Sequence, residues 1–544
     1  MKPKKLLLTL TALIGFLLFI SGTRFNSDFF EIAKQIEIFT TMFKELNMNY
    51  VDDTNPGDLM DEAIKSMLDD LDPYTKFYNE QDVEASRINQ AGDYTGIGAK
   101  ILTKKDKLVI IEPYKNYAAD KAGLKAGDEI IKVDDVLVSE FSEGAENLLQ
   151  GSAGTAVALT YLRNGKETSV TVNRESLEIH AVPYYSMINN NTGYIVLRQF
   201  NKKASLETIE ALQSLKAEGA KNLILDLRGN PGGLLNEAVN VTNIFVPKGE
   251  LVVSTKSKVK KYNKSYVTQR NPIDLSIPLV VIIDGKSASA SEIVSGALQD
   301  MDRAVILGSR SFGKGLVQRP KPVAYGTQMK ITISRYFTPS GRCIQALDYW
   351  NKDINGKATR IEQKNYNAFK TRNGRIVYDG GGIQPDIELS KSDFSPITKA
   401  ILNEQLIFDF ANEYYYSHNS LDLDNFILSD NDFNDFKSFI NSRGFDFKTE
   451  TELALTKMLD IAETENMYIE LKSAVSSLEK TIVSSKKKAI DKDRSQLLNL
   501  ISDEIIKRYY YSEGVYDYYT RHSPQVLKAL DLLKNPSEYQ NILR

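Results

Sequence analysis

The chain has 544 residues, of which 42% are hydrophobic and 26% charged. These values are close to the average for globular proteins and exclude both wholesale disorder and a membrane protein with many spans. Its 68 basic and 71 acidic residues leave a net charge of −3, which provides no broad positive field for a nucleic-acid backbone. One cysteine and three histidines exclude an internal disulfide framework, cysteine-based zinc fingers and most multi-histidine metal sites.

Residues 1–25 have the pattern of an export signal. Three lysines precede an apolar stretch from Leu6 to Ile20, and only Arg24 follows it, which favours a cytoplasmic N-terminus and an exported remainder. The stretch is shorter than the ~20 residues of a comfortable spanning helix, and no clean cleavage site follows it. Both a cleaved signal peptide and a retained membrane anchor therefore remain open.

Residues 26–90 are predicted to form two or three amphipathic helices. Apolar residues recur there at intervals of three and four, as in Ile32, Ile36, Phe43 and Leu46. The cluster Asn55-Pro56-Gly57 separates the helices.

Residues 91–178 are predicted to form a small β-rich module, because short runs of alternating polarity replace the helical spacing. Asn164-Gly165 between two such runs is a type I′ hairpin signal. Near its start lies Tyr94-Thr95-Gly96-Ile97-Gly98, a candidate backbone nest for a free carboxylate, beside which a peptide could add as an extra strand. It is not a dinucleotide fingerprint, because Ile101 stands where the third glycine is required.

Residues 179–392 alternate strand-like apolar runs with helical stretches and therefore predict an α/β layered domain. The predicted strands are Tyr194 to Leu197, Leu223 to Leu227, Leu279 to Ile283, Ala304 to Leu307 and Met329 to Ser334. Strand signals vanish beyond this domain, and residues 393–544 predict a helical C-terminal extension. Its lysine run, Lys486 to Lys488, is interpreted as a solvated helix face.

The serine cluster Ser287-Ala-Ser289-Ala-Ser291 lies between a predicted strand and a predicted helix. Ser289 and Glu292 have the spacing of a capping box, which would hold Ser289 at a helix N-terminus, where free N–H groups stabilise negative charge. A nucleophile there would have anion stabilisation built in, although the same spacing is also common in helix caps without chemistry.

The base for such a serine is more plausibly a lysine than a histidine. His180 lies at the edge of the β module, and His418 and His522 lie in the extension, so a Ser-His-Asp triad is improbable. A neutral amine can accept the hydroxyl proton once burial lowers its pKa. Lys314 stands between two glycines, and Gln318 follows it as an uncharged amide that could orient the amine.

Two further patterns bear on this site. Gly308 to Lys314 fits the first seven places of a P-loop, but Gly315 and Pro320 follow where a serine or threonine and a long helix are required, which excludes nucleotide binding. The turn Arg228-Gly-Asn-Pro-Gly-Gly233 follows a predicted strand. Its N–H groups could supply one oxyanion donor, and the N–H of Ala290 a second.

These segments, in this order, resemble the carboxyl-terminal processing peptidases, also called tail-specific proteases. The resemblance covers about residues 30 to 390. It rests on Leu71-Asp72-Pro73-Tyr74, a PDZ-like module, Arg228-Gly-Asn-Pro-Gly-Gly233, Ser287-Ala-Ser-Ala-Ser-Glu292, Ser311-Phe-Gly-Lys-Gly315, Thr338-Pro-Ser-Gly341 and Gly382-Ile-Gln-Pro-Asp386.

The resemblance implies a multidomain α+β fold: an α/β protease core with an inserted PDZ-like β domain, N-terminal helices and a C-terminal helical extension. It implies a Ser/Lys dyad of Ser289 and Lys314, with Gln318 in support and no metal or cofactor. Oxyanion donors map to Ala290 and to either Gly232 or Gly233.

The resemblance also implies a function and a location. The expected activity is that of a serine endopeptidase that cleaves exported proteins near their C-termini. The PDZ-like domain would bind the substrate tail at Tyr94, Thr95, Gly96, Ile97 and Gly98 and gate a narrow tunnel to the dyad. The expected place is the periplasmic side of the cell envelope, secreted or anchored to the inner membrane by the N-terminus.

Two questions stay open at this point. The extension lies outside the resemblance, so homo-oligomer formation, adaptor binding and substrate choice are alternative roles for it. The rival function is a catalytically silent PDZ scaffold that captures protein C-termini for a partner, but a scaffold does not need Ser289, Lys314 and Gln318 at these separations.

Overall fold

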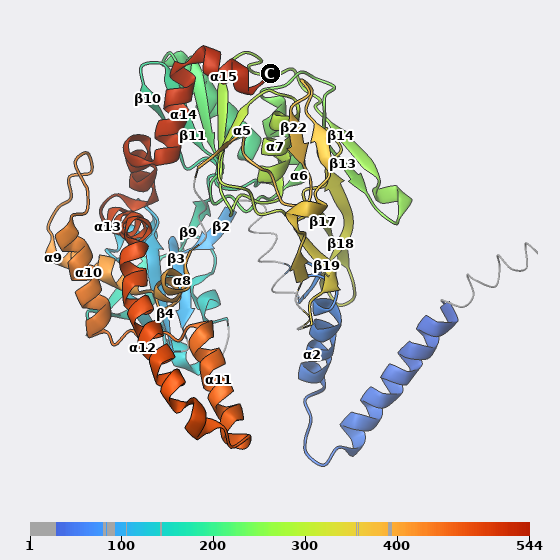
Figure 1. Cartoon of the computed structure of the whole chain (residues 1–544), viewed down its shortest axis with the longest axis vertical. Helices are drawn as coiled ribbons and strands as arrows, with labels where there is room; N and C mark the ends of the chain where they lie inside the picture. Colours follow the sequence, from blue (N-terminus) through green and yellow to red (C-terminus); the bar gives the residue numbers. More distant parts are fainter. Residues whose placement is uncertain are drawn as a thin grey trace, which may run out of the picture. The chain divides into compact units, whose positions relative to one another are not determined.

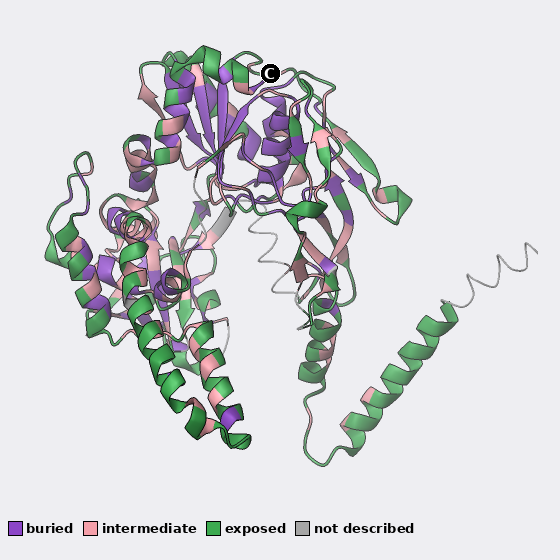
Figure 2. Cartoon of the chain, in the orientation of Figure 1, coloured by how far each residue is buried: buried purple, intermediate pink, exposed green. Residues whose placement is uncertain are grey.

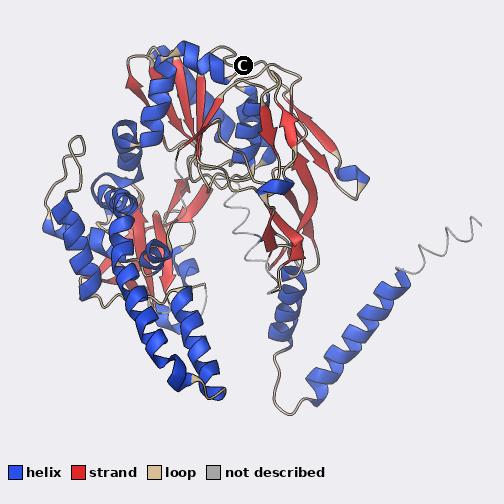
Figure 3. Cartoon of the chain, in the orientation of Figure 1, coloured by secondary structure: helices blue, strands red, loops and turns tan. Residues whose placement is uncertain are grey.

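The computed structural model describes residues 29–79, 83, 93–104, 106–141, 144–354, 356, 358–389 and 394–544, and the predicted export signal lies outside these ranges. The chain divides into two compact units, Met1–Tyr78 with Pro320–Ile331, and Asn79–Arg319 with Thr332–Arg544. Helices and sheets are mixed, as the multidomain α+β prediction requires (Figure 1, Figure 3). Within the described ranges, no helix combines the length and the apolar character needed to cross a membrane.

The smaller unit contains two helices in the region where the three-and-four spacing predicts two or three. Residues 29–49 form the first, and α2 (Pro56–Asp69) begins where Asn55 accepts the N–H of Gly57 (2.9 Å). Proline at the first helical position has no N–H to leave unsatisfied. Strand β1 (Lys76–Tyr78) pairs antiparallel with residues 328–330 of β18 (Gln328–Phe337).

The β module begins the larger unit. Its main sheet has the order β3-β4-β5-β7-β8, with β6 on β5, while β2 pairs with β9 apart from it. Asn164 (φ 49°) and Gly165 (φ 76°) both adopt the left-handed conformation that a type I′ turn requires. The elements are β2 (Asp93–Gly96), β3 (Ala99–Lys104), β4 (Lys107–Pro113), α4 (Ala118–Lys121), β5 (Glu129–Val133), β6 (Val136–Leu137), η1 (Val138–Glu140), η2 (Ala145–Leu149), β7 (Ala156–Arg163), β8 (Lys166–Asn173) and β9 (Glu175–Glu178).

A six-stranded sheet forms the centre of the larger unit. Its order is β10-β11-β12-β15-β16-β23, and every pair except β10–β11 is parallel. The inner strands are buried on both faces (Figure 2), which explains why they are continuous apolar runs in the sequence. The strands are β10 (Tyr184–Asn189), β11 (Thr192–Val196), β12 (Asn222–Asp226), β15 (Leu279–Ile283), β16 (Val305–Gly308) and β23 (Ile387–Glu388).

Helices cover both faces of this sheet. Helices α5 (Ala204–Ala217), α6 (Leu235–Asn243) and α7 (Ala290–Asp300) share a core with one face. The last two helices of the chain, α14 (Pro524–Lys534) and α15 (Pro536–Ile542), share a core with the other. The C-terminal helical region thus supplies one layer of the α/β core, a placement that hydrophobic periodicity does not predict.

Six further C-terminal helices precede α14 and α15, namely α8 (Pro396–Asn403), α9 (Leu406–Ser417), α10 (Asp430–Ser442), α11 (Glu450–Thr464), α12 (Tyr468–Lys492) and α13 (Arg494–His522). Of these, α8, α9, α10 and α13 form a separate core, the end of α12 packs against that core, and α11 contacts α12. Helix α13 breaks at Tyr511 (φ 58°, ψ −170°), and next to the break the N–H and hydroxyl of Ser512 both donate to Glu112 in β4 (2.8 and 2.7 Å). The hydroxyl of Tyr511 donates to Asp120 (2.6 Å), so the β module is bound to the C-terminal helices at this break.

A second, antiparallel sheet contains β13 (Leu251–Lys256), β14 (Lys264–Val267), β17 (Leu316–Pro322) and β18. In the larger unit β18 pairs with β13 in the register Thr255↔Tyr336 and Lys256↔Arg335. Short elements complete the fold, namely η3 (Lys260–Tyr262), β19 (Leu347–Lys352), β20 (Ala358–Arg360), η4 (Gln363–Asn365), β21 (Ala368–Lys370) and β22 (Ile376–Tyr378).

If α14 is a structural layer of the core, truncating its buried face must weaken the whole unit. Leu532 is fully buried in the core that α14 shares with the sheet. We expect Leu532→Ala to lower the free energy of unfolding by about 2–5 kcal/mol, the usual cost of such a cavity. Leu527→Ala is the matched control, because Leu527 lies on the same helix but is 45% exposed. Equal denaturant midpoints for the two variants would contradict this role of α14.

Candidate active site

Ser289 occupies a strained turn between β15 and α7. Its backbone has φ 54° and ψ −109°, a conformation that non-glycine residues rarely adopt. Its carbonyl accepts the N–H groups of Glu292 and Ile293 (both 2.9 Å), which opens the helix, and the hydroxyl of Tyr336 (3.3 Å). A sharp strand-to-helix turn of this kind presents the nucleophile in α/β hydrolases.

A single buried carboxylate connects Ser289 to the loop of Lys314. The Glu292 side chain is fully buried, and its Oε2 accepts the N–H of Ser289 (2.8 Å) and the N–H of Lys314 (2.9 Å). Its Oε1 accepts the hydroxyl of Ser311 (2.5 Å) and the N–H of Gly313 (2.7 Å). Burial raises the pKa of Glu292, and these four donors act against that shift. One oxygen atom therefore joins the main chains of the predicted nucleophile and the predicted base.

The glycines beside Lys314 are required by close packing. Gly313 has φ 89°, and a Cβ there would lie 2.3 Å from Cβ of Ala346. The N–H of Gly315 donates to the side chain of Gln345 (2.7 Å). A strand, β17, follows this loop where a P-loop requires a helix.

Gln318 lies on β17, four residues beyond Lys314. Its side-chain amide donates to the hydroxyl of Thr332 in β18 (3.2 Å). This bond fixes the amide between the two strands of the hairpin.

The glycine turn lies directly against the start of α7. A Cβ on Gly232 would lie 2.8 Å from Cβ of Ser289 and 2.9 Å from the nitrogen of Ala290, so only glycine fits. The carbonyl of buried Asn230 accepts the N–H of Ala288 and the hydroxyl of Ser291 (both 3.0 Å), on either side of Ser289.

The two candidate glycines differ in what their N–H groups do. The N–H of Gly232 donates to the side chain of Asn230 (2.9 Å). Gly233 pairs with Phe200 in a parallel bridge, formed by the N–H of Phe200 to the carbonyl of Gly232 and the N–H of Leu234 to the carbonyl of Phe200. In such a bridge the N–H of the middle residue points away from its partner. Within the described part of the chain, the N–H groups of Gly233 and Ala290 donate no hydrogen bond.

Sequence reasoning missed three residues that fix this geometry, namely Tyr336, Asn230 and Ser311. Tyr336 meets α7 only through the tertiary fold, so spacing along the chain gives no signal for it. Ser311 begins the motif Ser311-Phe-Gly-Lys-Gly315, but the motif does not indicate its contact with Glu292. Asn230 lies inside the glycine turn and was recognisable as a turn residue.

The predicted peptide-binding segment begins on β2 and ends at the start of β3. Ile97 is buried in the core of the module, and its carbonyl accepts the N–H of Ala119 (2.7 Å). Gly98 (φ 78°) accepts the N–H of Tyr114 (2.8 Å). Among the described residues, the N–H groups of Ile97 and Gly98 donate no hydrogen bond.

Strand β3 follows this segment and, among the described strands, lies at the edge of its sheet. Of those strands it pairs only with β4. Helix η2 contacts β3, and its Glu146 accepts the hydroxyl of Thr103 (2.7 Å).

A cavity of about 780 Å³ lies at the carboxyl ends of β11, β12 and β15. Residues of the β module, the glycine turn and the C-terminal helices line it, among them Glu112, Arg228, Lys286 and Asp503. Burial raises the pKa of Asp503 to about 6, and the hydroxyl of Tyr519 donates to it (2.6 Å). Ligands of open α/β sheets bind at this end of the strands.

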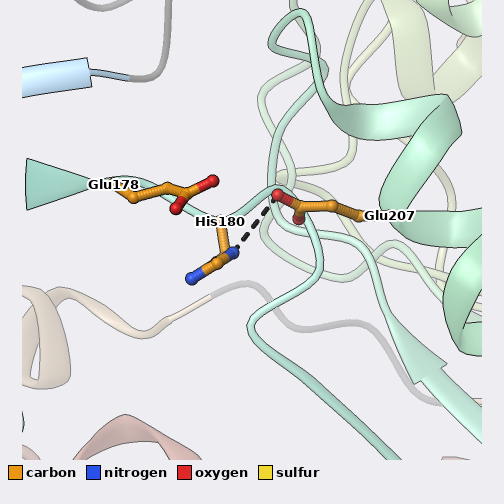
Figure 4. A group of neighbouring side chains, drawn as sticks. All are labelled: Glu178, His180 and Glu207. Carbon is orange, nitrogen blue, oxygen red and sulfur yellow. Dashed lines mark hydrogen bonds and ion pairs between the residues drawn. The ribbon is translucent and has the colours of Figure 1, made fainter.

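Glu178, His180 and Glu207 form the one described group with metal-ligand character, their ligand atoms lying within 4.8 Å of one another (Figure 4). Each carboxylate already has a partner: Glu178 pairs with Lys203 (2.7 Å), and Glu207 accepts the N–H of Val182 (2.8 Å) besides contacting His180 (3.2 Å). The group fastens the segment between β9 and β10 to α5.

Comparison with known proteins identifies the relatives of this chain. Three family models match the chain: "Peptidase family S41" over residues 191–354, "PDZ domain" over 95–173 and "Probable PDZ-protease, C-terminal helical domain" over 397–533. The carboxy-terminal-processing protease of Bartonella bacilliformis is 34% identical over 321 residues, covering 58% of this chain and 73% of that protein. The carboxy-terminal processing protease CtpA of Bacillus subtilis is 32% identical over 305 residues, covering 56% and 65%.

Among solved structures, the photosystem II D1 C-terminal processing protease shares 26% identity, with a TM-score of 0.36, over 66% of this chain and 90% of that one. Fold and matches together define a serine peptidase that contains a PDZ domain. The chain belongs to the carboxy-terminal processing proteases of peptidase family S41. The predicted family, fold class and enzyme class are thus confirmed.

Replacing Glu292 by glutamine tests its role between Ser289 and Lys314. Each oxygen of Glu292 accepts two hydrogen bonds, and glutamine replaces one of these oxygens by an NH₂ group. That NH₂ group would face two donors in a buried site and could accept a hydrogen bond from neither. We expect Glu292→Gln to lower the free energy of unfolding by about 1–3 kcal/mol and to lower kcat about 100-fold through misplacement of the reacting groups. Glu210→Gln, on the exposed face of α5, should change neither quantity. A variant with wild-type kcat would exclude Glu292 as a positioning residue.

Proposed function

We propose that this protease cleaves its substrates with a Ser/Lys dyad formed by Ser289 and Lys314. The observation that supports the proposal best is the Glu292 oxygen shared by the N–H groups of both residues. In this mechanism the hydroxyl of Ser289 attacks the scissile carbonyl while the neutral amine of Lys314 accepts its proton. Lys314 then returns the proton to the leaving amine, and water hydrolyses the ester on Ser289. Gln318 holds Lys314 in position.

The oxyanion of the tetrahedral intermediate is assigned to the N–H groups of Gly233 and Ala290. Ala290 is the first residue of α7, where the helix leaves N–H groups unsatisfied and its dipole favours negative charge. Gly233 is favoured over Gly232 because the N–H of Gly232 already donates to Asn230.

The PDZ domain supplies the recognition of protein or peptide substrates. We propose that the free C-terminal carboxylate of the substrate binds the N–H groups of Ile97 and Gly98, and that the tail adds to the open edge of β3 as an extra strand. The remainder of the substrate would reach Ser289 past the cavity between the PDZ domain and the glycine turn.

The place of action is proposed from the sequence of the first 25 residues. Lysines ahead of the apolar stretch from Leu6 to Ile20 favour export of the catalytic body to the periplasmic side of the inner membrane.

The dyad is tested with Ser289→Ala and Lys314→Met. Both should abolish hydrolysis of a peptide with an apolar C-terminus, a loss of at least about 10³-fold, while the Tm of each stays near that of the wild type. Chelators should not inhibit the wild-type enzyme. Turnover by the purified Ser289→Ala protein would eliminate Ser289 as nucleophile, and a wild-type protein that binds tails but hydrolyses none would favour the scaffold function.

Tail recognition is tested separately by amidating the substrate's C-terminus. Loss of the carboxylate should raise KM about tenfold or more, the value of a charge-assisted hydrogen bond. At saturating concentration, the amidated peptide should be hydrolysed at the same internal bond with unchanged kcat. Equal KM values for the acid and the amide would contradict binding of the tail in the Ile97–Gly98 loop.

A further inference from the structure

The hairpin of β13, η3 and β14 has an unusual charge for this chain. Residues 251–273 contain five lysines and one arginine and no acidic residue, whereas the whole protein has a net charge of −3. We call Lys256, Lys258, Lys260, Lys261 and Lys264, with Arg335 on the neighbouring strand, the basic hairpin. Its six side chains are all exposed, and Figure 1 shows the two strands extending as an arm beside β18.

Among the described residues, the cations of the basic hairpin have no acidic partner. In the described part of the chain none of them lies within 4.0 Å of a carboxylate, although lysines elsewhere do, as Lys203, Lys216 and Lys486 show. Two of them contact aromatic rings, Lys256 with Phe337 (4.4 Å) and Lys261 with Tyr262 (5.3 Å). The positive charge of the hairpin is therefore not neutralised within the described part of the fold.

The sheet also contains a pair of like charges, which is unfavourable. Lys256 and Arg335 lie directly opposite each other on β13 and β18. Like charges in that position destabilise a sheet. An anionic partner that binds the face carrying both charges offsets this destabilisation of the sheet.

This face points away from the active site. The neighbouring pair, Thr255 and Tyr336, is buried, and Tyr336 donates to the carbonyl of Ser289. Because successive side chains of a strand point to opposite faces, Lys256 and Arg335 face the other way. Lys264 is paired with Thr255 and therefore lies on the opposite face from Lys256 and Arg335. The partner of the charged pair Lys256 and Arg335 is therefore not the substrate segment at the scissile bond.

We propose that the basic hairpin docks on a bilayer surface that carries anionic lipid headgroups. The tip combines its lysines with apolar surface, since Val259 is 46% exposed and the ring of Tyr262 lies among them. Lysine stems with charged ends, together with aromatic and aliphatic groups, suit the boundary between headgroups and acyl chains. An acidic polypeptide would account for the lysines but not for an exposed valine at the tip.

The proposal is tested by flotation of the full-length protein with vesicles of phosphatidylcholine alone or with roughly 30% phosphatidylglycerol, since each lysine near an anionic surface contributes to binding. We expect the anionic vesicles to bind the wild type at least about tenfold more tightly, and added salt to weaken this preference. Replacing Lys256, Lys258, Lys260 and Lys261 together by glutamine should abolish the preference. Hydrolysis of a soluble peptide should stay unchanged, which shows that the variant is folded.

The matched control removes the same charge elsewhere. Lys457, Lys472, Lys480 and Lys488 are exposed on α11 and α12, and within the described residues none has an ion-pair partner, so their replacement by glutamine should leave the preference intact. The N-terminal apolar segment is present in every variant, so it contributes equally to all. Equal loss in both quadruple variants would overturn the proposal. So would binding of the wild type to poly-glutamate with no preference for anionic vesicles, which would assign the hairpin to an acidic protein.

Discussion

The backbone of Ser289 is the constraint on which the proposed active site depends. Its φ and ψ values of 54° and −109° lie in a region that costs a non-glycine residue about 1–3 kcal/mol. Such a conformation persists only when its surroundings over-determine it. Here the Glu292 carboxylate holds the N–H of Ser289, Tyr336 and the first turn of α7 hold its carbonyl, and Gly232 packs against its Cβ.

Glu292 does more than cap the N-terminus of α7, because its carboxylate also accepts hydrogen bonds from the loop of Lys314. A carboxylate buried without partners would be strongly unfavourable, but four donors from α7 and from the loop of Lys314 offset its desolvation. These donors are fixed by the same carboxylate, so the two segments cannot separate without exposing an unpaired acid. This arrangement makes the site preorganised, which is the property that stabilises developing charge most effectively.

The sequence predicts the local features of this protein well and its long-range contacts poorly. Apolar runs locate β15 and the other central strands, Asn164-Gly165 predicts the hairpin turn, and the order of the motifs gives the family. The contact of Tyr336 with Ser289, or of α14 with the central sheet, joins residues far apart in the chain, and no local pattern encodes it. The spacing of Ser289 and Glu292 predicted a capping box, but nothing in the sequence indicated that Glu292 also binds the loop of Lys314.

Strand β18 shows how one element can serve two surfaces without mixing them. Tyr336 faces the core and contacts the main chain of Ser289, whereas Arg335, one residue earlier, faces outward beside Lys256. The two-residue period of a strand separates these roles, so the charge of the outer face can change without disturbing the inner one. The net charge of −3 does not reveal the basic hairpin, because acidic residues elsewhere in the chain balance its charge. Composition alone therefore excluded a broad positive field but not a local one, and only the register of β13 on β18 shows where that local field points.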